Sequence, residues 1–487
     1  MNNYLESRTR SIPSEHRLST RDLVKLQARA LENLDELITD EGYFASSSKG
    51  SEGMYHAHFG RDTYITFSYL LETFKDKTTL SPAERSLFNR AINGFFAMDY
   101  YIAPADDPEL GVWAGQSIHE ARKTGYEHLI TRTDEQLARG ERPWFVDKDG
   151  IMKNWDSADA TPLDVILKGE LYQEKIFDPT PEQRAVMKQE LEWCRRNIRE
   201  YNGFAGFSYN PNRKFGGLLN QNWKDSAYSM LHENDVTEEK GRDPRKPFGR
   251  KPVEVNIFVW GALRYGADFF EGVDPAYAET LRQEAAELKA RFNSAEGGFL
   301  MRDQKADLWY FAEALDEDNR RVTNITVDPI LALWATHKGE SVVEEQYIHD
   351  LVKRGFMEDL FNPEAGFRTY GKYTKVHDPD GYHNGPETYW PFMSGLAAIG
   401  LDKRGYRREA EEVLEASLER IREFGSNIEM FKRDETGAYV RWRDRFSGQT
   451  SALDQAWTAG MVYYATSMLL KPSTVFAAPE SEEKIAS

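Results

Sequence analysis

The segment NQNWKDS, residues 220–226, places one carboxyl group beside an indole, three amides and a hydroxyl. An indole can cover one face of a pyranose ring, amides can bind sugar hydroxyl groups, and the carboxyl group of Asp225 can transfer a proton. Far downstream, Glu429 lies between apolar residues in the segment NIEMF, residues 427–431. Two such acids predict a hydrolase that splits glycosidic bonds.

Hydrolysis of an acetal with inversion uses two carboxyl groups in different roles. One protonates the leaving oxygen, and the other activates a water molecule on the opposite face, with the pair about 6.5–9.5 Å apart. A hydrophobic wall beside Asp225 would raise its pKa, which a general acid needs near neutral pH. Plainer interpretations stay open for both residues, because Asp225 could cap a helix and Glu429 could be a surface glutamate.

The long loop at 111–164 holds further polar clusters. His119 and Glu120 stand together, but no second histidine follows at ligand spacing, so we expect hydroxyl binding or loop bracing rather than a metal site. Asp159 lies in the segment NWDSADAT, residues 154–161, which has the same polar character. We therefore treat this loop as part of the binding site.

Charged residues also stand where helices are expected to begin. Arg61 and Asp62 precede a helical pattern at 64–74, and a structural ion pair would explain them nearly as well as sugar binding. Glu254 precedes the pattern at 255–270, where the helix dipole alone would favour an acid.

The sequence carries no signature of nucleotide use or serine hydrolysis. It contains no Gly-rich phosphate loop that ends in Lys-Ser/Thr and no Gly-x-Ser-x-Gly elbow. We therefore expect neither an organic cofactor nor a catalytic metal.

Composition narrows the partners of this 487-residue chain. A formal net charge of −18 repels phosphate backbones and anionic lipids, so we expect no binding to nucleic acid or membrane surfaces. Cys194 is the single cysteine, which excludes an internal disulfide and a cysteine-rich zinc site. No apolar signal segment stands in residues 1–21, and apolar runs such as 461–470 are too short to cross a bilayer. We expect a cytoplasmic protein, and a homo-oligomer is among the states that the sequence allows.

Apolar residues recur at helical spacing along most of the chain, and strand-like alternation is scarce. The helical patterns lie at 23–38, 64–74, 83–100, 182–201, 255–270, 277–292, 327–337, 346–360, 391–400, 406–424 and 456–469. Short connections alternate with long loops rich in Gly, Asn, Trp, Asp and Tyr. We predict an all-α ring of helical hairpins with functional loops on one face, formed by one domain at 21–470 between polar tails at 1–20 and 471–487.

Seven motifs occur in the order seen in a known family. They are FGRDT (59–63), HEAR (119–122), SADAT (157–161), NQNWKDS (220–226), PVEV (252–255), YHNG followed by WP (382–391), and QAW (455–457). The chain thereby resembles the C-terminal amylo-α-1,6-glucosidase domain of glycogen debranching enzymes and the related clan of trehalases, glucoamylases and processing α-glucosidases. Each motif is short, but their common order spans nearly the whole chain.

The resemblance implies an (α/α)6 barrel and an inverting, exo-acting α-glucosidase. Such an enzyme would cleave a terminal α-glucosyl bond, either of the α-1,6 debranching type or in a small α-glucoside. The resemblance also implies that Asp225 is the general acid and Glu429 the general base. The implied sugar-binding residues are Arg61, Asp62, His119, Glu120, Asp159, Trp223, Lys224, Glu254, His383, Trp390, Gln455 and Trp457.

The chain departs from the family pattern at two places. Asn222 stands where the family's NQGWKDS has glycine, which could redirect the backbone beside the acid. Four residues, 386–389, separate Gly385 from Trp390 where the family has two, and this insertion adds Glu387 as a further binding candidate near the expected funnel.

Other functions compete with hydrolysis. A helical barrel can also serve a phosphorylase, a lyase or an epimerase, although an epimerase would be expected to show paired catalytic histidines. A carbohydrate-binding protein without activity is the alternative outside enzymes, and the presence of both Asp225 and Glu429 disfavours it.

Overall fold

The computed structural model describes residues 18–48, 55–75, 77, 79–138, 141–226, 229–232, 248–378, 381–445 and 448–471. Most of the two expected tails, at 1–17 and 472–487, therefore lies outside the described residues. The division into tails and a single domain stays a prediction.

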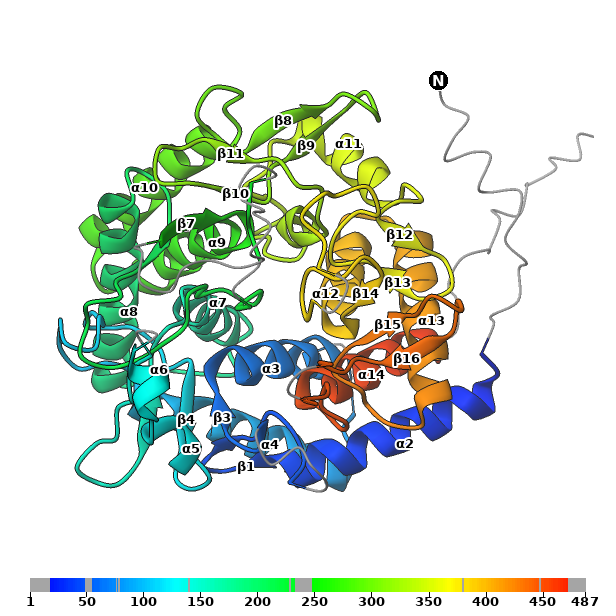
Figure 1. The fold of residues 1–487 in the computed structure, drawn as a ribbon, viewed down its shortest axis with the longest axis horizontal. Helices are drawn as coiled ribbons and strands as arrows, with labels where there is room; N and C mark the ends of the chain where they lie inside the picture. The colour runs from blue at the N-terminus through cyan, green and yellow to red at the C-terminus, as the bar shows by residue number, and fades with distance from the viewer. Residues whose placement is uncertain are drawn as a thin grey trace, which may run out of the picture.

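Twelve helical segments of the described chain alternate between an outer and an inner ring (Figure 1). The outer helices are α2 (Thr20–Leu37), α4 (Pro82–Ala97), α8 (Pro181–Glu200), α10 (Pro275–Phe292), α11 (Glu345–Gly355) and α13 (Arg407–Phe424). The inner ones are α3 (Gly60–Lys75), α7 (Ala160–Gln173), α9 (Val253–Phe270), the 3₁₀ helix η4 (Asp328–Leu333), α12 (Pro391–Lys403) and α14 (Ala456–Leu469). The inner ring closes because α14 packs on both α3 and α12. This is the expected (α/α)6 arrangement.

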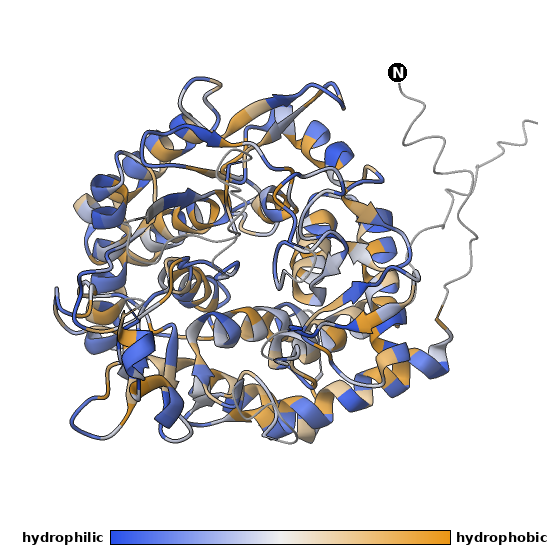
Figure 2. Ribbon diagram, in the orientation of Figure 1, coloured by the Kyte–Doolittle hydropathy of each residue, from blue (hydrophilic) through white to orange (hydrophobic). Residues whose placement is uncertain are grey.

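The outer helices are amphipathic, as their sequences predict. Helix α2 buries Leu23, Leu26, Ala30, Leu34 and Leu37, which follow one another at intervals of three or four residues. Hydrophilic residues cover the outward sides of the outer helices, and hydrophobic residues turn toward the inner ring (Figure 2).

The inner helices are buried on nearly all sides and carry no polar stripe. Nearly every residue of α9 is buried. A Cβ atom added to Gly169 in α7 would lie 2.5 Å from the Cβ of Tyr265 in α9, so these helices approach too closely for any side chain at Gly169. Burial on every side explains why α7 shows no helical period in the sequence, and the expectation of an uninterrupted loop at 111–164 is wrong at its end for this reason.

The helix expected at 327–337 is also shorter than predicted. Only Asp328–Leu333 forms regular structure, as a 3₁₀ helix with Pro329 in its first turn. The long loops contain small additional elements: η2 (Met98–Tyr101), α5 (Glu127–Ile130) and α6 (Asp134–Ala138).

Short strands fasten the loops at the N-terminal ends of the inner helices. Strands β3, β7 and β14 lead directly into α3, α9 and α12, respectively, or stand one residue before them. The larger sheets have the orders β3-β4-β5, β11-β10-β7-β6 and β14-β15-β16, and the pairs that the register resolves are antiparallel. This end of the barrel is therefore the rigid platform on which a site can be built.

The strands of these sheets and of the small hairpins have the following bounds: β1 (Ile38–Thr39), β2 (Gly42–Tyr43), β3 (His58–Phe59), β4 (Glu120–Arg122), β5 (Met152–Asn154), β6 (Phe207–Tyr209), β7 (Phe248–Pro252), β8 (Leu300–Asp303), β9 (Leu308–Phe311), β10 (Ala314–Leu315), β11 (Arg321–Val322), β12 (Phe361–Asn362), β13 (Gly366–Phe367), β14 (Thr388–Tyr389), β15 (Phe431–Arg433) and β16 (Tyr439–Arg441). Within the described ranges, none of the helices combines the length and the apolar character needed to span a bilayer.

Candidate active site

A cavity of about 290 Å³ opens at the platform end of the barrel. Asp225 and Glu429 both line it, although they are far apart in sequence. Its remaining lining residues are Ala45, Tyr55, Phe59, Arg61, Asp62, His119, Trp223, Ser226, Tyr382, His383, Trp390, Trp442, Gln449, Gln455 and Trp457. Eight of the expected sugar-binding residues are thus brought together around the two acids.

Five other expected residues lie behind the lining rather than in it. Each is engaged by an oppositely charged or amide partner in the protein. The pairs are Glu120 with Arg122, Asp159 with Arg61, Lys224 with Asp328, Glu254 with Asn222, and Glu387 with Arg368. These residues hold the lining in place, and the insertion at 386–389 directs Glu387 toward Arg368 and not into the cavity.

Asp225 faces the open cavity, where its side chain is 28 % exposed. Its carboxylate lies 3.6 Å from Nη1 of Arg61 and 4.0 Å from Nε2 of His383. Burial by the surrounding protein raises the pKa of Asp225 to about 6, and the charge of Arg61 opposes this rise. The group can therefore hold a proton in weakly acidic solution, well above the usual range of an aspartic acid, and be stabilised by Arg61 after losing it.

Glu429 is fixed by reciprocal contacts with Ala452. The backbone N–H of Ala452 donates to Oε2 of Glu429 at 2.7 Å, and the N–H of Glu429 donates to the carbonyl of Ala452 at 2.9 Å. Burial raises the pKa of Glu429 to about 7, and the bond from Ala452 opposes this rise. A carboxylate with a raised pKa is a stronger base for a water molecule.

Arg61 and Asp62 occupy the start of α3, where β3 ends. Arg61 donates from Nε to Asp159 at 2.7 Å, and Asp62 accepts from Nε2 of Gln455 at 2.7 Å. Burial raises the pKa of Asp62 to about 8 against the opposing charge of Arg61. Asp62 is therefore largely protonated at neutral pH and can donate a hydrogen bond to a ligand.

Aromatic side chains form the apolar wall of the cavity. Trp390 stacks on His383 with ring centroids 5.0 Å apart, and Trp223 meets Trp390 edge to face at 5.6 Å. Trp457 stacks on Phe392 at 4.3 Å. Flat apolar surfaces next to carboxyl groups suit the faces of a sugar ring.

His383 is neutral, because burial holds its pKa well below the usual range. Its Nδ1 accepts a hydrogen bond from the backbone N–H of Ser226 at 3.4 Å, so its proton lies on Nε2, the atom nearest Asp225. The pKa of buried His119 is likewise held well below the usual range.

The cavity also contains residues that motif reading did not select. Tyr55, Trp442 and Gln449 are among its lining residues, and Nε2 of Gln449 donates to the hydroxyl of Tyr55. Tyr382 belongs to the YHNG motif but was not singled out. The signal that these residues share is an aromatic or amide side chain in a long loop, which is too common to select them.

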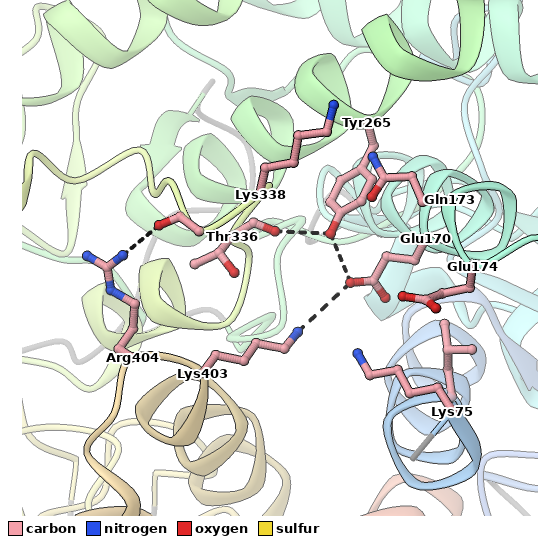
Figure 3. Close-up of a pocket in the computed structure, with 11 residues that line it drawn as sticks. Lys75, Glu170, Gln173, Glu174, Tyr265, Thr336, Lys338, Lys403 and Arg404 are labelled. Carbon is pink, nitrogen blue, oxygen red and sulfur yellow. Dashed lines mark hydrogen bonds and ion pairs between the residues drawn. The ribbon is translucent and has the colours of Figure 1, made fainter. Parts of the chain in front are cut away.

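A second cavity, of about 260 Å³, lies at the opposite end of the barrel (Figure 3). There the hydroxyl of Tyr265 bonds the carbonyl of Thr336 at 3.0 Å and Glu170 at 3.1 Å, and Lys403 lies 4.0 Å from Glu170. The C-terminal ends of α3, α7 and α12 meet here, and cations are favoured at such ends. Lysines at helix ends, paired with Glu72 and Glu170, account for the polar lining of this cavity, and no catalytic role is needed to explain it.

No group of three or more His, Cys, Asp or Glu side chains in the described ranges is arranged to hold a metal ion. The arrangement at the platform end offers three carboxyl groups with raised pKa, those of Asp62, Asp225 and Glu429, together with the guanidinium of Arg61 and apolar walls. Such a set can donate a proton to one ligand atom and accept a proton from another.

The sequence matches no protein-family model and no curated protein. Solved structures do match in fold. Mannosylglycerate hydrolase from Thermus thermophilus aligns with a TM-score of 0.52 at 14 % identity, over 91 % of this chain and 100 % of that chain. Glucoamylase from Saccharomycopsis fibuligera aligns at 0.51 and 13 % identity, over 93 % of this chain and 97 % of the other.

An α-mannosidase from Streptococcus pneumoniae, solved with α-1,6-mannobiose, aligns with a TM-score of 0.51 at 12 % identity, over 93 % of this chain and 95 % of that one. At identities this low, the structural alignments establish the fold only. The reaction has to be argued from the geometry of the site. The expectation from the resemblance is confirmed at the level of the fold: this chain is an (α/α)6 barrel and shares its fold with these solved structures.

Proposed function

We propose that this protein is an inverting, exo-acting α-glucosidase with Asp225 as general acid and Glu429 as general base. The observation that carries the proposal is the meeting of these two carboxyl groups in one cavity walled by tryptophans. Trehalose-type, debranching-type and small glucosides all end in the terminal α-glucosyl unit that such a cavity would hold.

In the proposed reaction Glu429 gains one proton and Asp225 loses one. Glu429 takes a proton from water as the water oxygen bonds the anomeric carbon, and Asp225 gives its proton to the leaving oxygen as the glycosidic bond breaks. Arg61, at 3.6 Å, then stabilises the carboxylate of Asp225. One proton is shared by the pair before the reaction and one after it.

The size of the cavity supports a small substrate. Its volume of about 290 Å³ lies just below the range of about 300–1,000 Å³ that is usual for small-molecule sites. We therefore favour a small α-glucoside over a polymer, with the α-1,6 branch linkage as the second candidate.

The structural neighbours support a sugar substrate without defining the sugar. Their names describe action on mannosylglycerate and a complex with α-1,6-mannobiose, as well as a glucoamylase. The sugar bound next to the acids must therefore be tested along with the linkage.

A hydrolysis panel tests the proposal. Isomaltose, panose, trehalose, kojibiose, glucosylglycerate and a branched dextrin are each incubated with the enzyme, beside the matching α-mannosides. We expect glucose release from at least one small α-glucoside and none in Asp225→Asn. Turnover that requires inorganic phosphate would indicate a phosphorylase, and calorimetric sugar binding without hydrolysis would indicate a binding protein; either result contradicts the proposal.

A further inference from the structure

A buried acid that does not line the cavity binds the loop that carries Asp225. Asp328, the first residue of η4, is fully buried. Its Oδ1 accepts from Nε1 of Trp223 at 2.7 Å, and its Oδ2 accepts from Nζ of Lys224 at 2.6 Å. One carboxylate thus binds the side chains of the two residues that immediately precede Asp225.

Lys224 has a second buried acidic partner. Glu313, also fully buried, accepts from Nζ of Lys224 through Oε1. Its Oε2 accepts from Nδ2 of Asn324 at 2.7 Å, and Tyr370 donates to its Oε1. Lys224 is therefore held between two acids from different parts of the chain, Glu313 between β9 and β10 and Asp328 in η4.

Two contacts on adjacent residues restrict a loop more than one contact does. The bond to Trp223 fixes the indole that lines the cavity, and the bond to Lys224 fixes the next residue on the side away from it. The backbone between them then has little freedom to rotate, so the direction of the following side chain, Asp225, is set. Rigid supporting contacts of this kind hold catalytic groups in productive geometry.

We propose that Asp328 is a positioning residue that sets the direction in which Asp225 presents its proton. The proposal rests on the proposed function, in which Asp225 is the general acid. Asp328 is not among the residues that line the cavity, and it acts through Trp223 and Lys224.

A misdirected acid harms a reaction only as far as the leaving group needs a proton. The leaving group of an alkyl glucoside such as isomaltose is an alcohol, and its departure depends strongly on protonation. The leaving group of 4-nitrophenyl α-glucoside is a stable phenolate, which departs without a proton. The two substrates carry the same glucosyl unit, so damage to sugar binding would affect both.

The test is Asp328→Asn, which keeps the shape and the acceptor for Trp223 but removes the charge that faces Lys224. We expect kcat for isomaltose, or for the best alkyl glucoside, to fall about tenfold or more, since general acid catalysis contributes about 10²–10⁴-fold. We expect kcat for the nitrophenyl substrate to fall much less. Glu313→Gln should act in the same direction, because it loosens Lys224 from its other side.

Glu190→Gln is the matched control. Glu190 is also fully buried and pairs with a buried lysine, Lys168, at 2.7 Å. In the described chain the other hydrogen-bond and ion-pair partners of these two residues are Asp99, Ser117 and Asp164, which lie outside residues 220–226. This variant should show the ordinary cost of breaking a buried ion pair, with no dependence on the leaving group. Urea unfolding of all variants places their stabilities on one scale.

Equal losses on both substrates in Asp328→Asn and Glu313→Gln would overturn the positioning role. Failure of the proposed function would look different. In that case Asp225→Asn itself would show no dependence on the leaving group, whereas a sound acid assignment makes Asp225→Asn the variant with the largest dependence.

Discussion

Arg61 is the residue whose removal tests the electrostatics of the proposed acid most sharply. Nη1 of Arg61 lies 3.6 Å from Asp225, and Coulomb's law at an effective dielectric constant of about 20 gives an attraction of about 4–5 kcal/mol at that distance. Asp225 is 28 % exposed, so solvent screens part of this attraction. A neighbouring arginine usually lowers a carboxyl pKa by about 1–3 units.

We therefore expect Arg61→Gln to raise the pKa of Asp225 from about 6 by about 1–2 units. Asp225 must be protonated and Glu429, with a pKa of about 7, must be ionised in the active form. The bell-shaped kcat/KM profile should therefore move to higher pH, its maximum by about half the change in the pKa of Asp225. The maximal rate should fall, because the carboxylate formed on proton donation loses its cation. The assay is kcat/KM for an alkyl α-glucoside between pH 4 and about 10.

The same change also costs stability, which needs its own control. Arg61 and Asp159 form a buried pair at 2.7 Å, and removal of one partner of such a pair costs about 3–5 kcal/mol. The double variant Arg61→Gln with Asp159→Asn removes the unpaired charge and should recover part of that loss in urea unfolding. Its kcat/KM profile should stay shifted to higher pH but by less, because the charge of Asp159 also raises the pKa of Asp225. An unshifted kcat/KM profile in folded Arg61→Gln would refute the assigned role of Arg61.

Three further predictions concern the two acids and the packing of the inner ring. The wild-type kcat/KM profile should be a bell with its maximum between about 6 and 7, the values near which Asp225 and Glu429 titrate as a pair, and a maximum below pH 5 would contradict this. Glu429→Gln should lower kcat by about 10²–10⁴-fold with KM little changed, as measured by steady-state kinetics. Gly169→Ala should lower the free energy of unfolding by about 1–3 kcal/mol in urea, because the new Cβ would lie 2.5 Å from that of Tyr265.

Sequence patterns predicted the outer ring well because its helices have one wet face. In α2, the intervals of three or four residues between Leu23, Leu26, Ala30 and Leu34 indicate an amphipathic helix directly. The inner ring gave weaker signals. Helix α7 is buried on every side and its period disappears, and η4 is shorter than its apolar pattern because a proline stands in its first turn.

The candidate site was predicted in part for a related reason. The ordered motifs identified residues near the N-terminal ends of inner helices, such as Arg61 and Trp390. In the structure, short strands lead into these helix ends and hold them in place. It did not separate residues that line the cavity from residues that brace it, because both are polar and adjacent in sequence. Lys224 and Asp225 illustrate this: they are neighbours, yet Lys224 is fully buried and Asp225 faces the cavity.

The stereochemistry of the first product tests the central claim most directly. A proton donor and a water-activating carboxylate on opposite sides of the sugar require that water enter from the face opposite the leaving group. Proton NMR during the first minutes of hydrolysis of an α-glucoside should therefore show β-glucose before mutarotation, and both Asp225→Asn and Glu429→Gln should abolish this signal. Initial release of α-glucose, or unchanged release by either variant, would contradict the account.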